Sequence, residues 1–157
     1  MNQAEDIKNA VEVLRKGGII LYPTDTVWGI GCDATNAEAV SRVYAIKHRD
    51  DSKALICLVD SDVRLQRYVR DVPAVAWELL DVVTKPTTVI LDGAVNLAPN
   101  LIADDGSIAL RITQEPFSKE LCYRFQKALV STSANISGEP AAANYCDISD
   151  DIINAVD

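Results

Sequence analysis

No stretch of this 157-residue sequence reaches the ~18–20 consecutive apolar residues of a membrane-spanning helix, so we expect no membrane association. Its four cysteines form no C-x-x-C pair and match no zinc framework, which predicts buried, reduced thiols and no metal site. Histidine occurs only once, at His48, and the G-x-S-x-G turn of many serine hydrolases is missing. The G-x-x-x-x-G-K-[ST] phosphate loop and the G-x-G-x-x-G dinucleotide fingerprint are missing too. A nucleotide site in this chain must therefore be built in another way.

Basic residues are scarcer than acidic ones, with 15 Lys and Arg against 23 Asp and Glu and a net charge of −8. This balance disfavours a protein that coats nucleic acid, because such proteins usually carry a basic face. The bases are unevenly spread, however, and gather between Arg42 and Arg70. Lys47, Arg49 and Lys53 crowd together just before the apolar run 54–59, which suggests a local anion site.

The length and the ordinary globular composition fit a single domain, 1–157. Apolar periodicity and capping residues predict helices over 4–14, 35–47, 61–70, 73–84, 116–129 and, weakly, 147–157. Thr35 and Glu38 form a possible capping box for the second of these helices, Ser61 can cap the third, and Pro73 opens the fourth. Strands are predicted over 19–22, 54–59, 87–93, 107–113 and 129–133.

Helices and strands mix without strict alternation, which favours an α+β, three-layer fold in which a mixed sheet carries helices on both faces. The strand within 54–59 has no polar face and should lie centrally, covered on both sides. The N-terminal segment is a charged amphipathic helix rather than a signal peptide, so we expect a cytoplasmic location.

Three polar stretches adjoin predicted strands: "PTDTVWGIG" at 23–31, "KHRDDSK" at 47–53 and "STSANISG" at 131–138. Loops at strand ends tend to converge on one crevice in such sheets, where ligands bind. Each stretch also has a purely structural explanation. Lys47 and Arg49 suit the C-terminus of a helix, and the first stretch could be a tight turn held by Thr and Asp.

The Ser-rich stretch favours hydrogen bonding to a polar ligand over nucleophilic catalysis. Ser133 and Asn135 alternate and share one side of an extended chain. Without a partner histidine nearby in sequence and without a G-x-S-x-G turn, Ser133 is a poor candidate nucleophile. Cations such as Lys47 and Arg49 suit phosphate or carboxylate.

Taken together and in this order, these stretches resemble the YrdC family of threonylcarbamoyl-AMP synthases. The resemblance rests on "GGIILYPTDTVWGIGCDA", on the K-x-R of Lys47 and Arg49 with Lys53 after it, and on the S-x-N of Ser133 and Asn135. Arg111 in "IALRIT" matches a family arginine at the end of a strand. The family resemblance implies a twisted mixed sheet that encloses a deep concave cleft.

The resemblance also implies an activity. L-threonine, bicarbonate and ATP would become threonylcarbamoyl-adenylate and pyrophosphate, catalysed by a nucleotidyltransferase with Mg²⁺ on the triphosphate. A partner enzyme, a tRNA threonylcarbamoyl transferase, would then modify an adenosine next to the anticodon of certain tRNAs.

The resemblance assigns a role to each candidate residue. Lys47 and Arg49 would be the catalytic cations, and no residue is assigned to a metal. The residues implied to bind substrate are Thr24, Asp25, Thr26, Trp28, Lys53, Thr88, Arg111, Ser131, Ser133 and Asn135.

The sequence departs from the family pattern in several places. Trp28 replaces a usual tyrosine, and a Pro-Gly-Pro-x-Thr stretch is reduced to "KPTTV" around Thr88. The final strand with a Pro-Ser-Thr motif is missing from this sequence, which favours an incomplete homologue as one alternative. A nucleotide- or double-stranded-RNA-binding module without turnover is another, with Arg64, Arg67 and Arg70 on one helical side as phosphate contacts.

Overall fold

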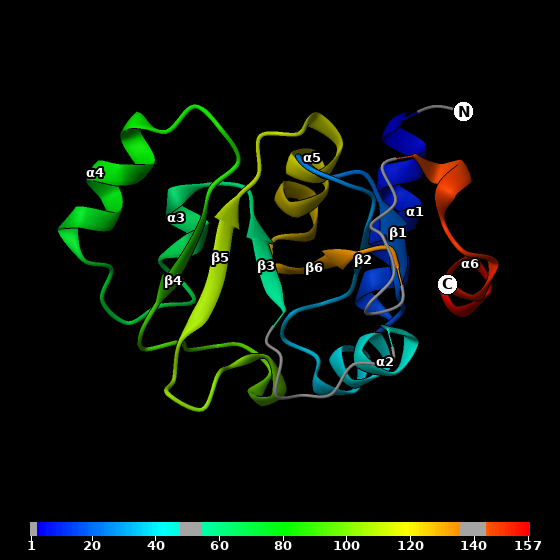
Figure 1. Ribbon diagram of the computed structural model, residues 1–157, viewed down its shortest axis with the longest axis horizontal. Coiled ribbons are helices and arrows are strands. Elements are labelled where there is room, and N and C mark those ends of the chain that lie inside the picture. The colour runs from blue at the N-terminus through cyan, green and yellow to red at the C-terminus, as the bar shows by residue number, and fades with distance from the viewer. Residues whose placement is uncertain (1–2, 48–54, 136–143) are drawn as a thin grey trace.

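A mixed sheet of six strands organises the described part of the chain, in the order β1-β2-β6-β3-β5-β4 (Figure 1). The structure is a computed structural model that describes residues 3–47, 55–135 and 144–157. Its strands are β1 (Ile20–Tyr22), β2 (Gly29–Gly31), β3 (Ile56–Val59), β4 (Thr88–Leu91), β5 (Ile108–Ile112) and β6 (Leu129–Ser133). Strands β3 and β5 are parallel, and every other neighbouring pair is antiparallel.

Six helices and two 3-10 turns of the described residues surround this sheet. They are α1 (Gln3–Arg15), α2 (Ala37–Lys47), α3 (Asp62–Leu65), α4 (Ala74–Val82), α5 (Pro116–Phe125) and α6 (Asp150–Ala155), with short 3-10 turns η1 (Pro99–Leu101) and η2 (Tyr145–Asp147). The segments expected as helices and strands are thus largely confirmed, and so is the α+β class.

Two apolar clusters lie on opposite faces of the sheet. Helices α1 and α5 pack side by side against one face and bury Leu58 and Leu129 (Figure 1). The other face buries Cys57, Val59 and Leu110 against the remaining elements. Because successive residues of β3 enter different clusters, this strand is covered on both sides at the centre of the sheet, as its apolar sequence indicates.

Among the strands of this sheet, β2 is the one that the sequence did not indicate, because two of its three residues are glycines, which are unfavourable in strands. The structure explains the glycines by the ring of Tyr22, which is fully buried and lies across β2. A Cβ at Gly31 would stand 2.5 Å from Cε1 of Tyr22 and 2.8 Å from the carbonyl oxygen of Val130. The close approach of this ring and backbone therefore requires glycine.

We expect Gly31→Ala to lower the free energy of unfolding by about 2 kcal/mol, because the added methyl group overpacks a buried backbone contact. Gly29→Ala is the matched control, since its Cβ would meet Thr24 Cγ2 at 3.1 Å and the nearest backbone oxygen at 3.5 Å. Urea unfolding of both variants measures the difference. Equal stability of the two variants would contradict this explanation of β2.

Two expectations about helix ends are wrong. The capping box expected from Thr35 and Glu38 does not start α2, because Asn36 Oδ1 accepts from the amide of Ala39 at 3.1 Å. Thr35 instead bonds to Asp33, through its amide at 2.8 Å and its hydroxyl at 2.6 Å. Asn36, one position after Thr35, therefore caps the free amides at the start of α2. The spacing of the sequence alone does not decide which of two adjacent polar residues forms the cap.

The expected basic helix face of Arg64, Arg67 and Arg70 is also wrong. Ser61 caps α3 as its sequence indicates, but α3 ends at Leu65, before the second of these arginines. The Arg64 side chain is 11% exposed and pairs with Asp60 at 2.9 Å. The helical face on which the RNA-binding alternative rested is therefore not formed.

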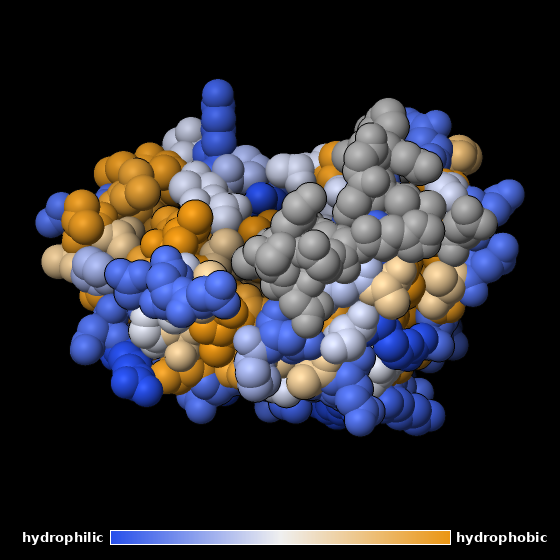
Figure 2. Space-filling model, turned by 60° about the horizontal axis from the view of Figure 1, so that its bottom comes forward, coloured by the Kyte–Doolittle hydropathy of each residue, from blue (hydrophilic) through white to orange (hydrophobic). Residues whose placement is uncertain are grey.

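Helix α4 leaves an apolar stripe exposed at one end of the molecule. Val75, Leu79 and Val82 follow helical spacing and are 68%, 45% and 73% exposed. Hydrophobic surface gathers at the left of Figure 2, on the side where Figure 1 places α4. Among the described residues, no helix is long and apolar enough to cross a membrane.

Cys32, Cys57 and Cys122 are buried, and Cys146 is exposed. Burial raises the pKa of Cys57 to about 12, and it raises the pKa of the other two buried thiols as well. Buried thiols that stay protonated are poor nucleophiles. This agrees with the expectation that these three cysteines serve as small apolar residues, whereas the exposed Cys146 shows that the prediction of four buried thiols is wrong for that residue.

We therefore expect one fast-reacting thiol in the native protein and four after denaturation, as measured with a colorimetric disulfide reagent at pH 8. Stability should fall as the pH rises past the ordinary thiol pKa of about 8.5, because the unfolded chain then releases protons that the native chain retains. Rapid modification of all four thiols under native conditions would contradict this expectation.

Candidate functional site

Four of the predicted site residues share one face of the sheet. In β4, β5, β3 and β6, the register aligns Thr88 with Arg111, Arg111 with Leu58, and Leu58 with Leu129. Residues aligned across strands point to the same side, and so do residues two positions apart. Ser131 and Ser133, which follow Leu129 at intervals of two, therefore lie on this face as well.

This face is covered over β6 but open over the other end of the sheet. Helices α1 and α5 bury Leu58 and Leu129. On β4, two residues from Thr88, Ile90 is 73% exposed, whereas Val89 and Leu91 on the opposite face are buried. Thr88 and Arg111 thus lie on an accessible sheet surface, and Arg111 Nε donates to Thr88 Oγ1 at 3.1 Å.

Lys47 lies at the end of β6, next to the Ser-rich stretch. It is the last residue of α2 and only 2% exposed. Its Nζ donates to the carbonyl oxygen of Ser133 at 2.7 Å and to its Oγ at 3.2 Å. A solvated helix terminus would leave this ammonium exposed, so the burial is better explained by a polar site built from two distant segments.

The same serine carbonyl is shared by Asn135, whose backbone amide donates to it at 2.9 Å. Asn135 is 9% exposed and Ser131 is 5% exposed. Burial raises the pKa of Tyr22, and its hydrogen bond with Ser131 opposes that rise. Ser131 and Asn135 are thus largely enclosed, and the half-buried Ser133 contacts the buried cation.

The loop from Thr24 to Trp28 connects β1 and β2 and is closed on itself. Thr24 Oγ1 donates to the carbonyl oxygen of Val27 at 2.6 Å and accepts from the amide of Thr26 at 3.4 Å. The carbonyl oxygen of Trp28, at the end of the loop, accepts from the amide of Ala134 at 2.9 Å, which places the loop beside the end of β6. Thr26 itself is exposed.

Asp25 is anchored to the end of β5. Its Oδ2 accepts from Thr113 Oγ1 at 3.2 Å and from the amide of Gln114 at 3.3 Å. These partners are 88 and 89 residues away, so Asp25 makes tertiary contacts in place of the local turn that the sequence left open.

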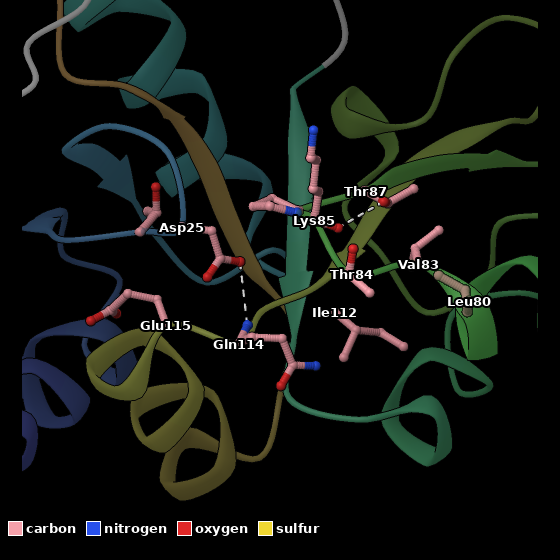
Figure 3. A pocket seen from close by; sticks show the side chains of 11 residues that line it. Asp25, Leu80, Val83, Thr84, Lys85, Thr87, Ile112, Gln114 and Glu115 are labelled. Carbon is pink, nitrogen blue, oxygen red and sulfur yellow. Dashed lines mark hydrogen bonds between the residues drawn. The ribbon is translucent and has the colours of Figure 1, made fainter.

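A cavity of about 430 Å³ lies between this loop, the β5–α5 junction and the segment joining α4 to β4 (Figure 3). It lies at the carboxyl end of β5, where ligands bind in open α/β sheets. Polar groups from Thr24, Asp25, Lys85 and Gln114 combine with an apolar wall that includes Leu80. Its size and mixed lining suit a small polar molecule.

Trp28 lies away from this cavity and contacts another. Its ring packs edge-on against Tyr145, with the ring centroids 5.5 Å apart. Both rings line a second cavity of about 620 Å³ between α1, β1 and the segment around α6. The predicted role of Trp28 as an apolar wall for a substrate beside Thr24 stays a prediction.

Three residues of the basic stretch lie outside the described residues: His48, Arg49 and Lys53. The sequence also gave no signal for Lys85, Thr113 and Gln114, which surround the cavity or hold its loop. Only the shortened "KPTTV" stretch drew attention to this region. The contact between Asp25 and Thr113 joins residues far apart in sequence, and no local pattern encodes it.

Among the residues that the structure describes, no group of three or more His, Cys, Asp or Glu side chains could hold a metal ion. The N-terminal amides of α5 are also taken, since the Glu115 carboxylate accepts from Phe117 at 3.1 Å and from Ser118 at 2.7 Å. An anion in the cavity would therefore depend on side chains such as Lys85 and not on the start of this helix.

Sequence comparison identifies related proteins over most of the chain. The Sua5/YciO/YrdC family model, with the description "Telomere recombination", matches residues 12–157. Threonylcarbamoyl-AMP synthase of Pseudoalteromonas translucida is 39% identical over 142 residues, which are 88% of this chain and 76% of that protein. The synthase of Vibrio cholerae is 34% identical over 151 residues, 94% of this chain and 80% of that protein.

Solved structures share the fold. Escherichia coli YciO superposes with a TM-score of 0.86 at 28% identity, covering 99% of this chain and 76% of that chain. Sua5 of P. abyssi complexed with L-threonine gives a TM-score of 0.92 at 24% identity, covering 100% of this chain and 46% of that chain. At that identity the second likeness supports the fold alone.

Proposed function

Because the chain belongs to the Sua5/YciO/YrdC family, we propose that it synthesises threonylcarbamoyl-AMP from L-threonine, bicarbonate and ATP. Relatives at 34–39% identity over most of their length carry the name of this synthase. The structural observation that carries the proposal is the contact between Lys47 and Ser133, which joins the K-x-R and S-x-N motifs around a buried cation.

The proposed reaction brings three anionic groups together: a carboxylate, bicarbonate and a triphosphate. The threonine amine attacks the bicarbonate carbon, and water leaves as the carbamate forms. A carbamate oxygen then attacks the α-phosphorus of ATP, and the bond to pyrophosphate breaks. No covalent intermediate on the protein is needed, and electrostatic stabilisation of the developing charge is the main catalytic requirement.

The described residues suit that requirement in part. Lys47 would stabilise phosphate and carbamate oxygens from the end of β6, and Arg111 would meet a further anion from the open sheet face. Arg49 and Lys53, which lie outside the described residues, are proposed as further cations for the same anions. Each charge-assisted hydrogen bond of this kind contributes about 1.5–3 kcal/mol.

Polar groups would orient the substrates. Ser133 and Asn135 would hold the nucleotide or the threonine carboxylate, above the buried Ser131. Thr24 and Thr26 would fix the polar groups of threonine, with Thr88 supporting Arg111. Mg²⁺ would arrive with the triphosphate and be held by phosphate oxygens and water, as is usual for this ion.

The product would pass to an enzyme that transfers the threonylcarbamoyl group to tRNA. The reaction transfers the adenylyl group of ATP to the carbamate, so it is a nucleotidyl transfer. One pyrophosphate is released for each adenylate formed.

Pyrophosphate release from ATP, measured with and without L-threonine and bicarbonate, tests the proposal. Release that needs both co-substrates is the expected result. Release without threonine would identify an ATP hydrolase of another kind, and ATP binding without any release would identify a homologue that lacks synthesis. Either result would overturn the proposed function.

A further inference from the structure

Two fully buried hydroxyl groups lie beneath the loop that carries Thr24 and Thr26. Thr113 and Ser118 are each 0% exposed, and their oxygens are 2.7 Å apart. One follows β5 and the other lies in the first turn of α5, so they bridge the junction between strand and helix. Buried hydroxyls of this kind are retained only when they are hydrogen-bonded.

The direction of their protons follows from the acceptor. Thr113 has one hydroxyl proton and donates it to Asp25 Oδ2 at 3.2 Å. Ser118 Oγ has two possible acceptors, the Thr113 hydroxyl at 2.7 Å and the carbonyl oxygen of Glu115 at 3.3 Å. With the Thr113 proton on Asp25, Ser118 donates to the Thr113 oxygen, which is the nearer of the two. The result is a chain of donors from Ser118 through Thr113 to the carboxylate, in which each bond polarises the next.

The Thr24–Thr26 end of the loop depends on this chain for its position over the cavity, whereas the other end is held by the bond from the Ala134 amide to the Trp28 carbonyl oxygen. The loop's own hydrogen bonds, from Thr24 to Val27 and from Thr26 to Thr24, fix its shape but tie it to no other element. Asp25 supplies a tie to the β5–α5 junction through Thr113 and the amide of Gln114, the second of which Figure 3 shows.

We propose that Thr113, supported by Ser118, is a positioning residue that sets Thr24 and Thr26 for the amino-acid substrate by holding Asp25. This inference rests on the proposed function, because it takes the loop to bind threonine. Thr113 touches no substrate in this account. Lys47 and Ser133 lie at the end of β6 with their own hydrogen bonds, so the nucleotide contacts should not depend on it.

Thr113→Val removes the hydroxyl while keeping the shape of the side chain. We expect the KM for L-threonine to rise about tenfold, because a displaced loop binds the amino acid in poor geometry. The kcat at saturating threonine and the KM for ATP should each stay within about twofold, a split that general destabilisation would not produce. Thr113→Ser restores the hydroxyl and should restore the KM to within about twofold of the parent value.

Thr35→Val is the matched control, since it removes another threonine hydroxyl that donates to a carboxylate, Asp33, at 2.6 Å. It should leave the KM for threonine unchanged. Asp25→Asn provides a second variant at a half-buried position and should raise the same KM even if the valine variant does not fold.

Hydrogen exchange separates this inference from the proposed function. If Asp25 is held as described, the Gln114 amide should exchange at least about tenfold faster in Thr113→Val than in the parent, whatever the activity. A parent protein without threonine-dependent turnover would overturn the function, while faster exchange would still support the loop anchor. Unchanged exchange, or a threonine KM within twofold of the parent value, would overturn the positioning role.

Discussion

Lys47→Met is expected to lower kcat/KM for pyrophosphate release about 10³-fold while leaving the protein folded. The buried ammonium contacts Ser133 through two hydrogen bonds and is the one proposed catalytic cation within the described residues. Removing a preorganised donor of this kind costs ~10²–10³ in rate, and a full charge in a water-poor site lies at the upper end.

The cost in stability should be smaller than the cost in activity. The Ser133 carbonyl keeps the amide of Asn135 as a donor after the substitution. Methionine fills much of the same volume, and the cost of burying a charge disappears. We therefore expect the free energy of unfolding to change by less than about 2 kcal/mol.

Lys127→Met is the control for this prediction. Lys127 also contacts an acceptor, Asp33 Oδ2 at 3.3 Å, but its side chain is 48% exposed. It should retain parental turnover. Parental turnover of Lys47→Met itself would show that the ammonium has only a structural role in fixing α2 against β6.

Arg111→Met is expected to lower kcat/KM about 10²-fold. Its guanidinium lies on the open sheet face, oriented by Thr88 at 3.1 Å. Losing a charge-assisted contact worth about 1.5–3 kcal/mol corresponds to a ~10- to 150-fold loss of rate.

The orientation can be tested separately. Thr88→Val should cost about fivefold, because the arginine keeps its charge but loses a fixed geometry. In the double variant the two effects should not add, since Thr88 acts through Arg111. Arg124→Met, which removes an exposed arginine paired with Glu120 at 2.8 Å, is the control and should have little effect. Full additivity would contradict the orienting role of Thr88.

Much of the fold could be predicted from local patterns. The apolar stretch that forms β3 predicts a central strand, and Ser61 and Pro73 mark helix starts that the structure confirms. These features depend on periodicity and capping, which act over a few residues. Strand β2 could not be predicted in this way, because the close approach of the Tyr22 ring requires its glycines, and that approach depends on packing between strands.

For the candidate site, too, local patterns identified individual residues but not the contacts between them. The sequence singled out Lys47 and Ser133 separately, and the structure brings them into contact across 86 residues. It left Asp25 between a turn and a substrate role, and only the approach of Thr113 explains the carboxylate. The resemblance to a family supplied the order of the motifs, whereas the hydrogen bonds between them come from tertiary packing.

Incorporation of labelled bicarbonate into a nucleotide adduct tests the central claim most directly: a buried cation at the end of β6 serves anionic chemistry. The parent protein, given ATP, Mg²⁺ and L-threonine, should form an adduct with the mass of threonylcarbamoyl-AMP that carries the label. Lys47→Met should form almost none, and Lys127→Met should match the parent. Equal incorporation by all three proteins, or none by the parent, would contradict the account.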